Sequence, residues 1–210
     1  GEIDDLLRTH RRVWLTPIRA GNWDHNGFVE GRLDRRALKV AETSFRAVRL
    51  SLYESPAVAS SHAEHLLDAS FGGAVTLNGF DVWPSAPASS SVELNAKAGQ
   101  TVALRLYWQA LGPIGTDYKV FVHIADGRGL TIGQHDHMPA DWTRPTSALL
   151  PGEIVLDKLD ITIALSAPPG EYEVKLGMYD PGSGKRLPVG VLPGRPASDH
   201  ETIARVNVVR

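Results

Sequence analysis

Histidines and aspartates concentrate in one stretch of the chain, residues 120 to 142, which reads VFVHIADGRGLTIGQHDHMPADW. His135 and His137 are separated by one residue there, and side chains two positions apart on a β-strand point to the same side of a sheet. Two imidazoles on one side make half of a tetrahedral zinc site, for which His123 is the candidate third ligand. The residue types therefore raise the question of a metal centre.

The same stretch also has the pattern of a β-hairpin whose polar side chains face water. An Asp-Gly pair between two alternating runs is a strong turn signal. A two-residue turn at Gly127-Arg128 places His123 opposite Ile132 rather than opposite His135. Because the spacing also matches no known zinc motif, we expect the histidine pair to lie on a solvated face without a transition metal.

Calcium is the other metal that this stretch suggests. Its oxygen ligands need no rigid spacing, so the carboxylates of Asp126, Asp136 and Asp141 are candidates. We rank this site together with the zinc site, and we expect neither metal nor any other cofactor in the chain.

The motifs of common enzymes are missing. Asp24 stands beside His25 in NWDHN, but adjacent residues rarely converge on one substrate atom, and we favour capping of a helix by Asp24 or Asn26. The chain has no Gly-x-Ser-x-Gly sequence and no phosphate-binding loop. We therefore expect the chain itself to have no catalytic activity.

Tryptophans in loops raise the question of carbohydrate binding, because sugars present C–H faces to aromatic rings. Trp142 and Trp83 are expected between strands, and Asp141, Arg144 and His137 lie near Trp142 in sequence, where they could hydrogen-bond sugar hydroxyls. The alternative, which we favour for a loop tryptophan, is a lid that covers the end of the core.

Composition excludes several classes of protein. The chain has 210 residues, a formal net charge of −2 and no cysteine. This balance of charge argues against nucleic acid or anionic lipid as a partner, and the missing cysteines exclude disulfides and thiolate metal sites. No run of apolar residues reaches the length of a membrane span, and no signal peptide is visible. Because the chain begins with glycine, we expect it to be a piece of a longer protein.

The first part of the chain, residues 1–68, has the pattern of a small α/β segment. Strands are expected at 12–18, 38–45 and 47–55, and the apolar residues that follow Gly27 recur at helical spacing. The stretch SPAVASSHAEHLLD reads as a linker, with a short helix over SHAEHLL.

The second part, residues 69–210, changes to a period of two. Val102, Leu104, Leu106 and Trp108 alternate with more polar neighbours, and four later runs behave in the same way. Turn sequences such as LNGF, PPGE and DPGSG separate these runs. The spacing predicts an antiparallel β-sandwich of about eight strands, Ig-like or jelly-roll-like, with Trp108 in the core and one wet face on each sheet.

These runs also resemble a known module. The matching segments are LRLYWQALGPIGTDYKVFVHIADGRGLTIGQHDHMP, RPTSALLPGEIVLDKLDITI and PPGEYEVKLGMYDPGSGKRLPV. They are similar to the C-terminal β-sandwich region of bacterial polytopic membrane glycosyltransferases related to the dolichyl-phosphate-mannose–protein mannosyltransferases. Residues 12–55 resemble the segment that follows the last membrane helix of such parents, so the resemblance covers nearly the whole chain.

The resemblance implies an extracytoplasmic, non-catalytic region at the bacterial cell membrane that recognises or positions a glycan or protein acceptor. Its constant partner would be the membrane-embedded portion of the same polypeptide, whose catalytic acidic loop this chain does not contain. One departure is Leu149-Leu150, where the family often has tryptophan before Pro151-Gly152. Two alternatives stay open, a stand-alone carbohydrate-binding module and a metal-dependent hydrolase centred on the three histidines.

Overall fold

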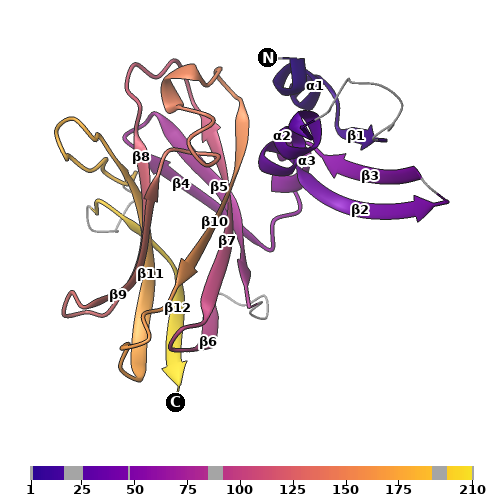
Figure 1. The fold of residues 1–210 in the computed structure, drawn as a ribbon. Helices are drawn as coiled ribbons and strands as arrows, with labels where there is room; N and C mark the ends of the chain where they lie inside the picture. The colour runs from indigo at the N-terminus through magenta and orange to yellow at the C-terminus, as the bar shows by residue number, and fades with distance from the viewer. Residues whose placement is uncertain (1, 17–25, 47, 85–91, 191–197, 210) are drawn as a thin grey trace.

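The computed structural model describes residues 2–16, 26–46, 48–84, 92–190 and 198–209. Its N-terminal part combines short helices with a three-stranded antiparallel sheet in the order β1-β3-β2 (Figure 1). The elements of this part are α1 (Glu2–Thr9), β1 (Arg12–Leu15), α2 (Phe28–Arg36), β2 (Leu38–Phe45), β3 (Val48–Glu54) and α3 (Pro56–Ser60). No helix in the described ranges has the length and apolar character needed to cross a membrane.

The rest of the chain forms a β-sandwich, as the period of two predicts. One sheet has the strand order β10-β7-β5-β4 and the other the order β6-β12-β11-β8-β9. All described pairs of neighbouring strands are antiparallel except β6 with β12, which is parallel. The elements are β4 (His65–Phe71), β5 (Val75–Trp83), β6 (Glu93–Lys97), β7 (Thr101–Ala110), β8 (Lys119–Ala125), β9 (Thr131–His137), the 3-10 turn η1 (Thr146–Ala148), β10 (Ile154–Thr162), β11 (Gly170–Tyr179) and β12 (Glu201–Val209).

The core lies between the two sheets and is built from the alternate residues that the sequence marks as apolar. On β7, Val102, Leu106 and Trp108 are fully buried. The indole of Trp108 packs edge-on against Phe71, with ring centroids 5.5 Å apart. The prediction that Trp108 is a core residue is confirmed, and burial of this side chain contributes about 2–3 kcal/mol to the stability of the fold.

The outer face of the four-stranded sheet is not solvated throughout, contrary to the expectation of one wet face per sheet. Tyr107 points to this outer face and is nevertheless only 1% exposed. It is buried in a small cluster with Leu156 of β10 and Ala59 of α3. The N-terminal part therefore covers one end of this face. The alternation along β7 correctly places Tyr107 on the outer face of the sheet. It cannot show which other part of the chain packs on that face.

Hydrogen bonds fix the N-terminal part to the sandwich. Lys158 of β10 donates from Nζ to the carbonyl oxygens of Asp34 and Ala37, at 2.6 and 2.8 Å, where α2 ends. Burial and the nearby charge of Arg105 lower the pKa of Lys158 to about 8. Within the sandwich, the Tyr107 hydroxyl donates to Asp81 of the neighbouring strand at 2.8 Å.

Two local expectations in the N-terminal part are wrong. The cap of α2 is Gly27, in the left-handed region with φ 63° and without a side-chain cap, rather than Asn26, and Asp24 lies outside the described residues. The short helix lies over Pro56–Ser60 instead of over SHAEHLL, because proline suits a first helical turn. The residues from His65 onward already form β4, so the four-stranded sheet begins a few residues before position 69.

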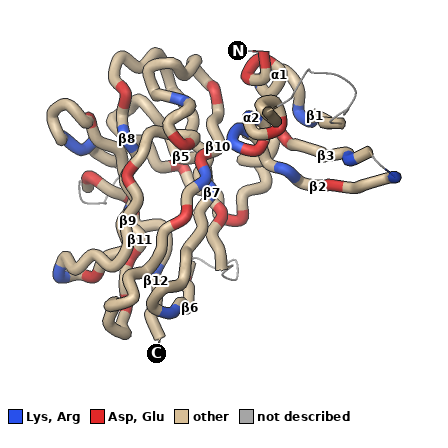
Figure 2. The backbone as a smooth tube through the Cα atoms, viewed as in Figure 1, with Lys and Arg blue, Asp and Glu red and all other residues tan. Residues whose placement is uncertain are grey.

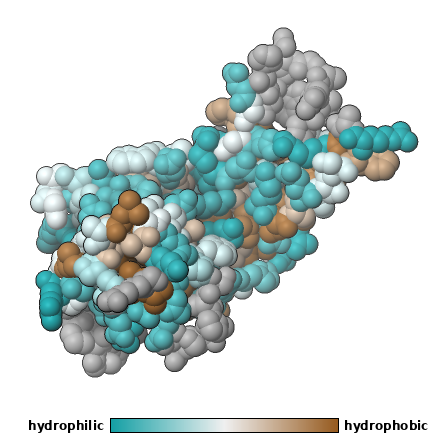
Figure 3. Space-filling view, turned by 60° about the horizontal axis from the view of Figure 1, so that its bottom comes forward, coloured by the Kyte–Doolittle hydropathy of each residue, from teal (hydrophilic) through white to brown (hydrophobic). Residues whose placement is uncertain are grey.

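The three-stranded sheet has two different faces. One side packs against α1 and α2 through Tyr53, Leu33 and Leu7. The other side leaves Trp14 58% and Phe45 72% exposed. Figure 3 colours one face of the molecule by hydropathy and shows hydrophobic residues next to hydrophilic ones on its surface.

Candidate functional site

The two sheets come together along β9 and β10, which are edge strands of their respective sheets. Ala164, just after β10, donates its backbone N–H to the carbonyl of Ile132 at 2.7 Å. Gly133 permits this approach, since a Cβ there would lie 2.9 Å from Cγ2 of Ile161. The side of the sandwich is therefore nearly closed, and the side chains of both edges can contribute to one site.

A groove of about 660 Å³ lies at this junction and continues over the outer face of the four-stranded sheet. We call it the edge groove. Three of the five side chains that the sequence suggested for a ligand site line it, namely Trp83, Asp141 and His137. Its full lining is Trp83, Ala103, Leu104, Arg105, His135, His137, Asp141, Lys158, Leu159 and Asp160.

Trp83 supplies the aromatic surface of the edge groove. The expectation that Trp83 lies in a loop is wrong, because it is the last residue of β5 and pairs with Ala103 of β7. The guanidinium carbon of Arg105 lies 4.3 Å from the centre of the indole, and Arg105 is in turn 3.9 Å from the carboxylate of Asp81. A cation over the ring fixes the orientation of the indole.

His137 is buried, although the sequence suggested a solvated histidine pair. It is 1% exposed, and its Nε2 lies 2.9 Å from both carboxylate oxygens of Asp157, which is fully buried. The same carboxylate accepts the backbone N–H of Ala140 at 3.0 Å and the indole N–H of Trp108 at 3.3 Å. Because both described contacts of Nε2 are carboxylate oxygens, which accept hydrogen bonds, Nε2 is the donor in them. His137 and His135 point toward the junction because their strand pairs with core residues of β8 on that side.

The segment after β9 holds Asp141 in the groove by an unusual backbone. Ala140, Asp141 and Trp142 all have positive φ angles, of 54°, 50° and 64°. Non-glycine residues in this region store strain, and such strain is concentrated at functional sites. Trp142 is 52% exposed, with the Nζ of Lys119 4.7 Å from its ring centre, so it is not a lid over the core.

Arg144 does not reach the groove. It forms a two-pronged ion pair with Glu153, with Nε and Nη2 at 2.9 and 2.7 Å from Oε1. Of these two sequence neighbours of Trp142, Asp141 therefore lines the groove, whereas Arg144 is paired with Glu153.

The candidate metal ligands are separated. The loop between β8 and β9 runs from Asp126 to Leu130 and is longer than the expected two-residue turn, so His123 pairs with Gln134 instead of Ile132. His123 consequently lies on the face opposite to His135, with its Nε2 3.1 Å from Asp136. Within the described ranges, no three His, Asp or Glu side chains are grouped so that they could hold a metal ion.

The calcium candidates also lie in three different places. Asp126 accepts two backbone N–H groups of its own loop, those of Arg128 and Leu130. Asp136 contacts His123, and Asp141 lies in the edge groove. The structure does not bring these carboxylates together.

Sequence reasoning missed three polar residues of the groove, Arg105, Lys158 and Asp160. All three occupy outward positions of alternating strands, where a charged residue is ordinary. Their common location follows from the pairing of β7 with β10, in which Lys158 lies opposite Arg105 and Asp160 opposite Ala103. The sequence contains no signal for that register.

Comparison with known proteins gives structural matches only. No family model matches the chain, and no curated protein matches it. One similar solved structure is the C-terminal domain of wzt, with 11% identity, a TM-score of 0.39 and coverage of 68% of this chain and 77% of that one. Another is a Niemann-Pick type C2 protein from the Japanese carpenter ant, with 7% identity, a TM-score of 0.43 and coverage of 68% and 98%.

Proposed function

We propose that this chain is a non-catalytic accessory domain that binds a glycan in the edge groove. The observation that carries the proposal is the combination of one oriented indole, that of Trp83, with acidic and basic side chains in a single open groove. Binding sites for small molecules typically combine an apolar surface with a few convergent polar groups.

The groove supplies both kinds of contact that a sugar needs. A pyranose ring would place its C–H face on the face of the Trp83 indole that Arg105 does not cover, and its hydroxyls would donate to the carboxylates of Asp141 and Asp160. Arg105 and His135 offer N–H donors to the ring and hydroxyl oxygens. Arg105 is already positioned by the Trp83 ring and by Asp81, which lowers the entropy lost when a ligand binds.

The geometry favours binding over catalysis. Asp157, the best-connected carboxylate near the groove, is fully buried and holds three donors, so it is poorly placed to meet a substrate. The three histidines of the hydrolase alternative lie on two faces of the sheet. These contacts support a structural role for Asp157 and His137 beneath the groove.

We also propose that the parent is a membrane glycosyltransferase-like protein with this region on the extracytoplasmic face. The support is the resemblance of residues 12–55 and of the later strands to such parents. In that setting the edge groove would hold the acceptor glycan near the membrane-embedded portion. We expect the upstream reading frame to encode many hydrophobic spans. If it does not, the proposal about the parent protein is wrong, whereas the proposal of a glycan site in the edge groove is unaffected.

A glycan array tests the binding function directly. We expect the wild-type chain to bind a subset of glycans, and Trp83→Ala and Asp141→Asn to lower the affinity at least about tenfold, equivalent to about 1.4 kcal/mol. Trp14→Ala is the matched control, because Trp14 is an exposed tryptophan of the three-stranded sheet, away from the groove. Wild-type protein that binds nothing on a broad array, or equal losses for Trp83→Ala and Trp14→Ala, would overturn the proposal.

A further inference from the structure

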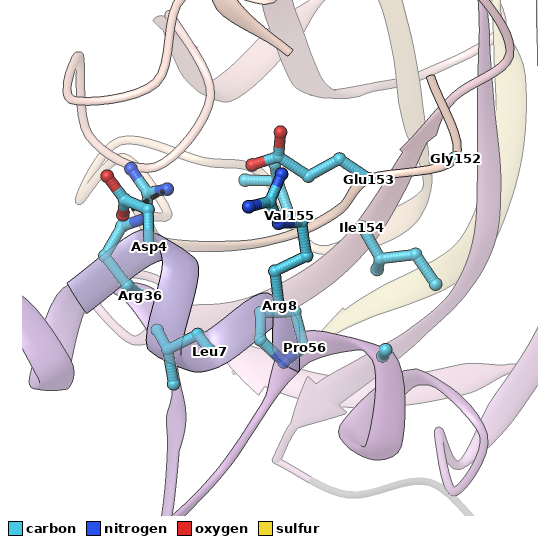
Figure 4. A pocket seen from close by; sticks show the side chains of 10 residues that line it. Asp4, Leu7, Arg8, Arg36, Pro56, Gly152, Glu153, Ile154 and Val155 are labelled. Atoms are coloured by element: carbon cyan, nitrogen blue, oxygen red, sulfur yellow. Dashed lines mark ion pairs between the residues drawn. The ribbon is translucent and has the colours of Figure 1, made fainter. Parts of the chain in front are cut away.

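A second, smaller pocket lies where the N-terminal helices meet the sandwich. It has a volume of about 130 Å³ and is formed by residues of α1, α2 and α3 on one side and of β10 on the other. We call it the interface pocket. Figure 4 shows Asp4 and Arg36 at one side of it and Arg8 and Glu153 at the other. It shares no lining residue with the edge groove.

Arg36 is the central feature of the interface pocket. This arginine is 5% exposed, and its Nη2 forms an ion pair with Asp4 at 2.8 Å. Its other terminal nitrogen, Nη1, is buried and has no hydrogen-bond partner among the residues that the structure describes. A buried charged donor without an acceptor loses its hydration and gains nothing in return, so the site is incomplete without a group that accepts from Nη1.

The acidic residues around the pocket are already engaged. Glu153 accepts both prongs of Arg144 as well as the backbone N–H of Leu150. Asp4 accepts from Arg32 at 2.8 Å in addition to its pair with Arg36. These carboxylates are therefore occupied by their present cations.

Among the described residues that ion pairs join around the pocket, positive charge exceeds negative charge by one. Figure 2 shows basic and acidic residues together on α2 and on the facing strands. The four cations are Arg8, Arg32, Arg36 and Arg144, and the three acids are Asp4, Asp5 and Glu153. Burial lowers the pKa of Arg36, and the charges of Arg144 and Arg32 lower it further against the attraction of Asp4. One negative charge in the pocket would restore the balance.

The remaining wall of the pocket is apolar. Half of the lining residues are hydrophobic, and they are Leu7, Pro56, Ala57, Ile154 and Val155. A ligand that fills the pocket must therefore have a hydrocarbon part as well as an anionic group.

We propose that the interface pocket binds a small aliphatic monocarboxylate. Its carboxylate accepts from Nη1 of Arg36 and from the guanidinium of Arg8, whose present pair with Asp5 is solvent-exposed and easily exchanged. Its hydrocarbon chain contacts Leu7 and Ile154. The ligand would join α1 and α2 to β10 and so stabilise the docking of the N-terminal part.

Water and phosphate fit these observations less well. The pocket of 130 Å³ far exceeds the about 10–15 Å³ that one ordered water requires, and water would leave the apolar wall without a partner. Phosphate carries up to two negative charges and no apolar group, whereas Asp4 and Glu153 line the pocket and repel a second negative charge.

The test is calorimetric titration with butyrate, with thermal unfolding as a second readout. We expect butyrate to bind and to raise the melting temperature of the wild-type chain, whereas sodium chloride and inorganic phosphate at matched ionic strength do not. Arg36→Met should abolish binding. Ala57→Leu should weaken it at least tenfold without disturbing any ion pair, because Ala57 is an exposed residue of α3 that lines the pocket.

Arg12→Gln is the matched control, since Arg12 forms an exposed pair with Glu54 outside the pocket and should keep full binding. Binding of phosphate as strong as that of butyrate would overturn the proposal. So would unchanged binding in Ala57→Leu, no heat with butyrate, or a high-resolution structure in butyrate that shows only ordered water on Nη1. Glycan binding by the edge groove is measured separately and is independent of each result.

Discussion

Both carboxylate oxygens of Asp157 lie 2.9 Å from Nε2 of His137, and neither residue reaches solvent. Asp157 belongs to the four-stranded sheet and His137 to the five-stranded one. The contact therefore links the two edge strands across the sandwich. It also supports the floor of the edge groove, because Asp157 holds the backbone N–H of Ala140 at the start of the left-handed segment.

The link between Asp157 and His137 should contribute strongly to stability. Asp157→Ala leaves three buried donors without an acceptor, and we expect it to lower the free energy of unfolding by about 3–5 kcal/mol. Urea denaturation measures this change. Asp160→Ala, on the same strand but exposed, is the control and should change the value by less than about 0.5 kcal/mol. Equal effects of the two substitutions would show that the buried link is not important.

Trp142 should contribute little to stability, because its side chain is half exposed and its main contact is the cation of Lys119. We expect Trp142→Ala to cost about 0.5–1 kcal/mol. Trp142→Gly should be more stable than Trp142→Ala by about 1 kcal/mol, since glycine relieves the strain of a φ of 64°. Thermal unfolding of the two variants compares them directly, and a large loss for both would restore the idea of a lid.

Lys158 should make stability depend on pH in a defined direction. Its folded pKa of about 8 is below the ordinary value of 10.5, so its buried charge is unfavourable below pH 8. Between pH 8 and 10.5 the unfolded chain binds a proton that the folded chain has lost, and the free energy of unfolding rises with pH. The neutral amine still has two N–H groups for the carbonyls of Asp34 and Ala37.

We expect this rise to amount to about 1–2 kcal/mol, after allowance for the partial exposure of the amine. It is measured as the difference between wild type and Lys158→Met in urea at pH 7.5 and pH 9.5. A difference that stays constant with pH, or that changes in the opposite sense, would contradict the assignment.

Gly133 should be essential for the close approach of β9 and β10. In Gly133→Ala the new Cβ would lie 2.9 Å from Ile161 Cγ2 and 3.1 Å from the carbonyl of Thr162, so β9 must move outward. We expect a loss of about 1–3 kcal/mol in stability and weaker glycan binding in the edge groove. Gly127→Ala is the control, because a Cβ there has no neighbour within 4 Å. A Gly133→Ala protein with unchanged stability would show that the junction is loose.

The sandwich could be predicted from the sequence because alternation is a local property of each strand. Residues such as Val102 and Trp108 must face the core wherever their strand is placed. The burial of Tyr107 could not be predicted in this way, since it depends on α3, nearly fifty positions earlier in the chain, packing on the outer face. The predicted pairing of His123 with Ile132 is wrong for a related reason. A loop that is longer by a few residues changes the register of the hairpin.

Only part of the candidate site could be predicted from the sequence, for the same physical reason. Trp83 is a candidate because of its aromatic ring, and Asp141 and His137 are candidates because they lie near Trp142 in sequence. All three line one groove. Arg144 is a candidate on the same ground as Asp141, but its guanidinium is held by Glu153. Contacts between strands decide which charged side chains remain available, and a single sequence does not contain the pairing of strands.

The parallel pairing of β6 with β12 has a consequence for the order in which the protein can fold. The amide of Asn207 donates to the side chain of Asn95, and these residues are 112 positions apart. Because β12 lies between β6 and β11, the five-stranded sheet lacks an interior strand until the last residues of β12 have left the ribosome. Contacts this distant in sequence slow folding, and the nascent chain would expose the edges of β6 and β11 during synthesis. Removal of residues 201–209 should accordingly yield a chain that aggregates instead of a slightly shorter domain.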